Sequence, residues 1–244
     1  MTSVIKDNLA RVRERMAQAA ERAGRTLSEI TLVAVTKQKT VAEVQEAILA
    51  GVRELGENRV QEGVKKAAWI NDWWAKEGRA AAGAPETLRW HLIGHLQTNK
   101  VKYAVEVFQL IHSVDSLHLL AEIDRRAGGK DLIVPVLLEV NVSGEATKAG
   151  LPPAEVLPLL EKVAQFEHIR VEGLMTVAPL VADPEETRPV FRGLWQLAER
   201  IKGEGFPGVT MTYLSMGMSN DFEVAIEEGA NLVRIGTAIF GPRQ

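Results

Sequence analysis

The sequence contains no cysteine. This absence excludes disulfide bonds, thiolate metal sites and cysteine nucleophiles, and it suits a protein of a reducing compartment. Long apolar runs are also missing, since none approaches the ~20 residues needed to span a bilayer. Residues 1–25 mix charges with apolar positions and lack the apolar core of a signal peptide. We therefore expect a cytoplasmic protein that is not embedded in a membrane.

Neither sign of charge dominates the chain. Its 29 Lys and Arg residues face 32 Asp and Glu residues, for a formal net charge of −3. This balance provides no general attraction to nucleic acid or to anionic membranes, and we expect neither as a partner. The sequence also lacks a Walker lysine loop and a Gly-x-Ser-x-Gly nucleophile elbow.

The histidines do not form a recognisable metal motif. His91 and His95 are four residues apart, but a helix-weakening Gly94 lies between them and no glutamate base accompanies them. We therefore expect no metal site. The remaining histidines are scattered, and we expect them to be packed or exposed: His112, His118 and His168.

Eight apolar, strand-like segments alternate with helix-like segments along the chain. The predicted strands are 31–36, 54–56, 90–94, 109–113, 132–142, 168–177, 209–214 and 231–236. The predicted helices are 3–24, 41–51, 58–75, 96–106, 116–127, 153–166, 184–202 and 220–229. Several strands are continuous apolar runs, which is typical of parallel strands covered on both faces.

This alternation predicts an α/β protein with a single (β/α)8 TIM barrel, one domain spanning residues 1–244. An open doubly wound sheet is the alternative. No full-length helix follows the eighth predicted strand, so we expect the extra helix at 3–24 to fill that place in the outer ring. Residues 65–89 hold three of the five tryptophans, Trp69, Trp73 and Trp74. They indicate either a long helix with a loop, its indoles packed on the barrel, or a partner surface.

Three features fall at the carboxyl ends of predicted strands, where barrel enzymes bind their ligands. Lys37 closes the first strand, and Ser215-Met216-Gly217-Met218-Ser219 follows the seventh. Gly236 and Thr237 follow the eighth, where backbone N–H groups and a hydroxyl can bind a dianion. Because the first and last strands of a barrel are neighbours, the amine and the phosphate turn share one rim. This combination indicates pyridoxal phosphate held as a Schiff base on Lys37, with Lys39 as the next candidate.

Arg234 lies within an apolar run, where an unpaired guanidinium is costly to bury. One interpretation pairs it with a carboxylate such as Glu57 or Glu139. The other sets it against the pyridine nitrogen of the cofactor. A guanidinium stays protonated, so that nitrogen would stay unprotonated, and the ring would be a poor electron sink. Glu57, Asn58 and Arg59 end the second strand, where they either contact a ligand or cap the next helix.

Long motifs occur in the order expected for a known family. They are Val33–Lys37, Gly56–Glu62, Trp90–Lys100, Glu139–Glu145, Gly173–Thr176, Leu214–Asp221 and Val233–Gly241. From about residue 31 to the C-terminus, the chain strongly resembles the YggS/PROSC family of pyridoxal-phosphate homeostasis proteins. Two features depart from the family pattern: segment 65–89 is longer than expected, and His95 stands where proline is expected.

The resemblance implies a barrel similar to the N-terminal domain of alanine racemase, with pyridoxal 5′-phosphate (PLP) on Lys37. It places Arg234 at the pyridine nitrogen and Asn58 near the cofactor. It also implies the residues around the phosphate: Ser215, Ser219, Gly236 and Thr237. The family lacks established catalysis and is linked to control of PLP and amino-acid pools. We therefore expect a PLP homeostasis protein that is not an enzyme.

Two other functions remain as alternatives. A PLP-dependent racemase or decarboxylase of this fold is the first, but racemisation needs acid/base groups on both faces of the substrate. In alanine racemase a tyrosine is the second acid/base group, and an extra β domain helps to position it. We expect no room for such a domain in this chain. The tyrosines of this chain are Tyr103 and Tyr213. The second alternative is a cofactor-free Schiff-base lysine aldolase.

The resemblance leaves open whether PLP is stored, sensed or delivered to apo-enzymes as partners. Because one barrel holds the whole predicted site, we expect a monomer or a weak dimer.

Overall fold

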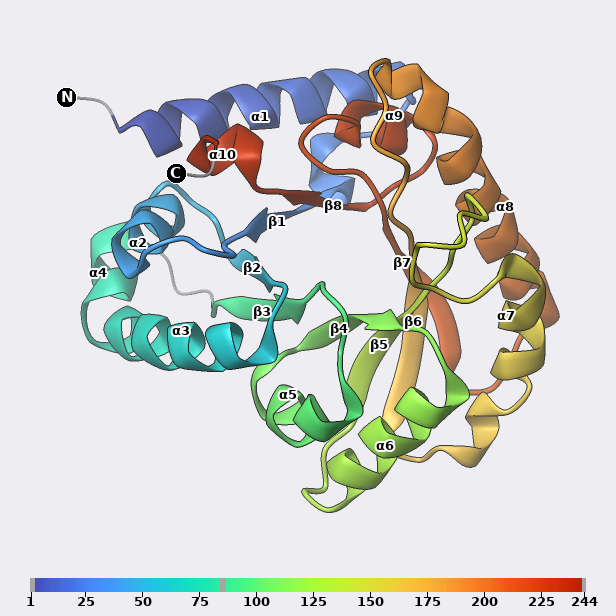
Figure 1. Ribbon diagram of the computed structural model, residues 1–244. Coiled ribbons are helices and arrows are strands. Elements are labelled where there is room, and N and C mark those ends of the chain that lie inside the picture. Colours follow the sequence, from blue (N-terminus) through green and yellow to red (C-terminus); the bar gives the residue numbers. More distant parts are fainter. Residues whose placement is uncertain (1–2, 84–86, 243–244) are drawn as a thin grey trace.

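Eight parallel strands form a closed barrel in the computed structural model, which describes residues 3–83 and 87–242. The strands follow one another around the barrel in chain order (Figure 1). They are β1 Thr31–Val35, β2 Glu54–Glu57, β3 Arg89–Leu92, β4 Leu110–Val114, β5 Val134–Glu139, β6 Ile169–Met175, β7 Val209–Ser215 and β8 Leu232–Ile235. The last strand pairs with the first, from Thr31 opposite Leu232 to Ala34 opposite Ile235. The predicted barrel is thus confirmed, and the open-sheet alternative is wrong.

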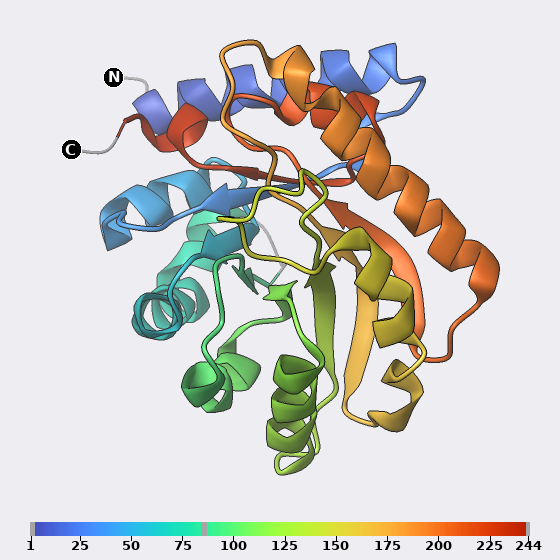
Figure 2. The ribbon, with the colours of Figure 1, turned by 45° about the vertical axis from the view of Figure 1, so that its right-hand side comes forward.

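Helices surround the barrel on its outside (Figure 2). They are α1 Val4–Arg22, α2 Val41–Leu49, α3 Val60–Trp73, α4 Arg79–Ala82, α5 Val101–Val107, α6 Leu117–Gly128, α7 Pro153–Leu160, α8 Arg188–Glu204, α9 Phe222–Glu227 and α10 Thr237–Phe240. Within the described residues, no helix is long and apolar enough to cross a membrane.

The N-terminal helix α1 occupies the predicted place in the outer ring. Its Ser3 cap accepts a hydrogen bond from the N–H of Lys6, which satisfies one of the first free amides of the helix. One face buries an apolar stripe that includes Leu9, Val12 and Met16. This helix packs against α9, α10 and α2, and so covers the seam between the first and last strands. In the part of the chain that the structure describes, the four-residue α10 is the helix that follows β8, and α1 lies in the remaining place of the ring.

The tryptophan-rich segment is mostly helical. Helix α3 continues into a π-helical turn, Trp74–Gly78, and then into α4, which ends at Gly83 with a left-handed φ of 61°. Trp74 is buried, and the Arg53 guanidinium lies 5.0 Å from its ring centroid. Trp69, in contrast, is 72% exposed. The predicted long helix is therefore confirmed, whereas packing of all three indoles is wrong; residues 84–86 of the expected loop lie outside the described part.

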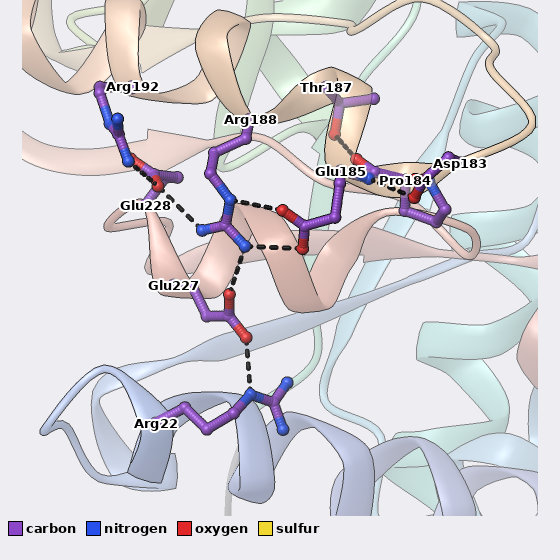
Figure 3. Close-up of polar contacts among 9 residues, drawn as sticks. All are labelled: Arg22, Asp183, Pro184, Glu185, Thr187, Arg188, Arg192, Glu227 and Glu228. Carbon is purple, nitrogen blue, oxygen red and sulfur yellow. Dashed lines mark hydrogen bonds and ion pairs between the residues drawn. The ribbon is translucent and has the colours of Figure 1, made fainter.

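A network of ion pairs joins α8 and the end of α9 to α1 (Figure 3). Arg188, at the start of α8, donates to both carboxylate oxygens of Glu185 at 2.7 Å. It also donates to Glu227, the last residue of α9, at 2.6 Å and to Glu228, the C-cap of that helix, at 2.9 Å. Arg22 of α1 completes the chain by donating to Glu227 at 2.7 Å. Hydrogen bonds to these carboxylates raise the pKa of Arg188 above its usual range.

We expect Arg188→Met to lower the free energy of unfolding by about 1 kcal/mol, the upper end for partly exposed pairs. Because salt screens such charges, the loss should shrink at high ionic strength. Urea denaturation at low and high salt measures both effects. Lys202→Met is the control, since it removes a separate exposed pair with Glu199. Equal urea midpoints for wild type and Arg188→Met would show that this network does not stabilise the fold.

Candidate functional site

A cavity of about 560 Å³ opens at the carboxyl ends of the strands. All but one of the predicted site residues line it: Lys37, Asn58, Ser219, Arg234, Gly236 and Thr237. Apolar side chains contribute other parts of its wall, among them Val35, Ile93, Val177, Leu180 and Met218. Its size and its mixture of apolar wall and converging polar groups are typical of a small-molecule site.

Lys37 enters the cavity just after β1, and Lys39 does not. The structure places Lys37 in the cavity wall, two residues beyond the last residue of β1. The amine of Lys39 instead donates to the carbonyl oxygen of Phe240 at 3.2 Å and pairs with Glu43 at 3.2 Å. Of the two candidate lysines, Lys37 is the one that lines this cavity in the described structure.

The turn after β8 has the geometry of an anion site. Gly236 precedes α10, and its carbonyl accepts the first helical hydrogen bonds, from Ile239 and Phe240. Amides at the start of such a turn have no partner within it and can bind an anion. Ser219 Oγ accepts from the N–H of Ala238 at 3.2 Å, which joins the loop after β7 to this turn. A Cβ on Gly236 would lie 3.2 Å from the Cβ of Val35, so glycine allows the turn to pass close to β1.

Arg234 forms part of the cavity floor and is only 4% exposed. Its Nη1 donates to Ser215 Oγ at 2.6 Å and its Nη2 to the carbonyl oxygen of Thr176 at 2.9 Å. Burial lowers the pKa of Arg234 to about 10, against the opposing effect of Glu139 and Asp221. The guanidinium is therefore a charged donor at neutral pH. The interpretation that pairs Arg234 with Glu57 or Glu139 is therefore wrong, because its hydrogen bonds go to a hydroxyl and a carbonyl.

Glu57 has a different partner, which the sequence analysis missed. Its Oε1 accepts hydrogen bonds from Thr36 Oγ1 and Lys66 Nζ, both at 2.6 Å. Lys66 Nζ also donates to the carbonyl oxygen of Thr36 at 2.6 Å and to Glu62 at 3.0 Å. Burial raises the pKa of Glu57, while these donors oppose the rise. The spacing of Glu62 and Lys66, four residues apart on α3, was the available sequence signal.

Asn58 does not cap the following helix, contrary to one of the two interpretations. Helix α3 begins after Arg59, which makes no side-chain capping bond. Asn58 instead lines the cavity, and its Oδ1 is buried without a hydrogen-bond partner in the described residues. Buried acceptors are normally satisfied, so this oxygen indicates a ligand that supplies a donor.

Ser215 is the predicted residue that lies outside the cavity wall. It is fully buried beneath Arg234, and its hydroxyl also contacts Nδ1 of His112 at 2.9 Å. His112 in turn contacts His91. Neither contact was predicted from the sequence, although both histidines lie within predicted strands. His95 is exposed beside Asp115, and the described residues hold no group of three or more side chains suited to a metal ion.

Comparison with known proteins identifies close relatives. Residues 7–244 match the family model described as alanine racemase, N-terminal domain. The chain is 43% identical to the pyridoxal phosphate homeostasis protein of Aquifex aeolicus, with 98% of each chain covered. It is also similar to PipY of Synechococcus elongatus, whose structure was solved with PLP bound. That match has a TM-score of 0.81, 35% identity, and coverage of 97% of this chain and 100% of PipY.

A more distant likeness concerns the fold alone. The alanine racemase of Clostridium difficile superposes with a TM-score of 0.71 at 16% identity. The match covers 98% of this chain but only 56% of the racemase. The two proteins therefore share the barrel fold, and this similarity says nothing about activity.

Proposed function

The chain belongs to the family of pyridoxal phosphate homeostasis proteins, and we propose that it binds PLP covalently through Lys37, without catalytic turnover. The single observation that carries this proposal is the cavity itself. One amine, one buried guanidinium and one amide-rich turn converge on a space of about 560 Å³. The PLP-bound structure of the similar PipY supports the same ligand.

The residues present fit this cofactor. The turn at Gly236 and Thr237 offers amides and a hydroxyl to a phosphate, and Ser219 adds a second hydroxyl. The unpartnered Oδ1 of Asn58 can accept a hydrogen bond from a donor group of the ligand. When bound, PLP supplies an aldehyde that reacts with a lysine amine. Ser215 holds Arg234 from below, and we therefore assign it to positioning rather than to phosphate contact.

The absence of turnover is part of the proposal. Arg234 keeps its proton and donates toward the ring nitrogen, which makes the ring a poor electron sink. Racemisation also needs a second acid/base group, and no tyrosine is among the residues that line the cavity in the described structure. Tyr103 is 45% exposed on α5, and Tyr213 packs against the apolar interior of the barrel.

The composition of the chain and the placement of the site also bear on its cellular setting. The lack of cysteine supports a reducing, cytoplasmic compartment. The amine, the guanidinium and the phosphate-binding turn all belong to one barrel, so the site needs no second subunit, and we propose a monomer or a weak dimer. A covalently held cofactor in an open cavity is available for transfer, so we propose apo-enzymes that need PLP as partners.

A spectrum of the purified protein, before and after borohydride reduction, tests the proposal. We expect a visible absorption band on addition of PLP, and mass mapping should place the reduced adduct on Lys37. Incubation of the loaded protein with single L-amino acids should give no racemisation. A protein that stays colourless with PLP would favour the lysine aldolase, and robust racemisation would favour the racemase.

A further inference from the structure

A chain of hydrogen bonds runs through the interior of the barrel and ends at Arg234. Arg234 Nη1 lies 2.6 Å from Ser215 Oγ, which lies 2.9 Å from Nδ1 of His112. Nε2 of His112 lies 2.8 Å from Nδ1 of His91, whose Nε2 lies 2.6 Å from Oε2 of Glu54. The five residues come from five strands, β8, β7, β4, β3 and β2.

The two ends of this chain face different surroundings. Arg234 lines the cavity at the carboxyl ends of the strands. Glu54 is the first residue of β2, its side chain is 18% exposed, and it lines a depression beside residues 51–53 that precede the strand. Between them, His91, His112 and Ser215 are buried. The chain therefore connects the cavity with the amino-end surface of the barrel.

The chemistry of its members gives the chain a single direction. A guanidinium can only donate and a carboxylate can only accept. Burial lowers the pKa of both imidazoles, which favours their neutral form with a single N–H each. A neutral His91 that donates from Nε2 to Glu54 accepts at Nδ1 from His112. His112 then donates from Nε2 and accepts at Nδ1 from the hydroxyl of Ser215, which accepts from Arg234.

This arrangement holds a buried cation without a direct carboxylate partner. Each hydrogen bond in an oriented chain polarises the next, and the effect is strong where water is excluded. We propose that Glu54, His91, His112 and Ser215 are positioning residues that orient Arg234 as a donor toward the ring nitrogen of the cofactor. The inference rests on the proposed PLP site. The direction of the chain is set by the carboxylate of Glu54, although that residue lies outside the cavity.

Nitrogen NMR of the ligand-free protein with labelled histidines tests the chain without any cofactor. We expect two neutral imidazoles with the proton on Nε2 that do not titrate between about pH 5 and 8, where an ordinary histidine does. His112→Gln assigns one of the signals, and His118→Gln, at an exposed position, is its control. Titration of either buried histidine in this range, or a proton on Nδ1, would overturn the directed chain.

Ligand preference tests the positioning role. Wild type should prefer PLP over the analogue in which carbon replaces the ring nitrogen. Ser215→Ala should reduce this preference roughly tenfold, as for a lost hydrogen bond to a charged group. Its affinity for the analogue should stay the same. Glu54→Gln, which keeps the shape but removes the charge, should reduce the preference by a smaller factor. Thr212→Ala removes an exposed hydroxyl of the same strand and should change neither affinity.

The outcomes separate this inference from the proposed function. General damage to the site would weaken both ligands equally, and that result would overturn the positioning role while leaving PLP binding intact. Failure of wild type to take up PLP would refute the proposed function and with it the role toward the ring. The NMR result would then decide only whether the directed chain exists.

Discussion

We expect replacement of Lys37 by alanine to abolish the borohydride-reduced PLP adduct. The physical reason is that Lys37 is the lysine whose side chain lines the cavity beside the turn at Gly236. The hydroxyls, the amides and the guanidinium remain, so the variant should still bind PLP reversibly, with the spectrum of the free aldehyde. Absorbance titration with PLP, followed by borohydride reduction and peptide mass mapping, measures both the covalent and the reversible binding.

Lys39→Ala is the matched control for this variant. Its amine contacts Phe240 and Glu43 rather than the cavity, so the adduct should form as in wild type. The same substitution removes one surface contact with α10 and thereby controls for general loosening of the rim. An adduct that survives in Lys37→Ala and disappears in Lys39→Ala would transfer the covalent role to Lys39.

Lys66→Met should be the most destabilising change, with a loss of about 3–5 kcal/mol at neutral pH. The substitution leaves the fully buried Glu57 carboxylate without its cationic partner. It also removes the donor to the carbonyl oxygen of Thr36, the residue before Lys37, so the PLP adduct should form more slowly. Urea denaturation gives the free energy of unfolding, and the absorption band gives the rate of adduct formation.

The loss should depend on pH in a defined direction. Burial already raises the pKa of Glu57 above its ordinary 4.5, and loss of Lys66 raises it further. A group with a raised folded pKa binds its proton more tightly in the folded state, so stability falls as the pH rises through that pKa. The deficit of Lys66→Met should therefore be smallest below about pH 4.5, the ordinary glutamate value, and grow above it.

A double variant separates the buried charge from simple loss of packing. In Glu57→Gln with Lys66→Met, no carboxylate remains to be desolvated, and most of the stability should return. Its unfolding free energy should also lose the extra pH dependence. If the double variant were as unstable as Lys66→Met at every pH, the cost would lie in packing and the charge argument would be wrong.

Local patterns in the sequence favoured the architecture that the structure shows. Continuous apolar strands separated by helices indicate a parallel sheet covered on both faces, and eight such repeats favour a barrel over the open sheet that the structure excludes. The placement of Lys37, Arg234 and Gly236 on one rim followed from the same argument. In a barrel all strands run in one direction, so residues just after different strands share one edge. The motifs that resemble the family then indicated which ligand the rim would hold.

Such local patterns could not predict the side-chain contacts inside the barrel. Strand register and the direction of each side chain decide that Ser215 lies beneath Arg234 rather than beside the phosphate turn, and that His91 meets His112. For the same reason, the carboxylate of Glu57 binds Lys66 of α3 and not Arg234 of β8.

The sequence alone therefore determined the order of the elements and the edge at which the site lies, and it favoured a closed barrel over an open sheet, since these depend on the periodicity of neighbouring residues. The tertiary structure alone decided which buried polar groups meet. Such pairings join residues far apart in the chain, and each depends on the shear of the barrel and on the cost of leaving a buried donor or acceptor unpaired.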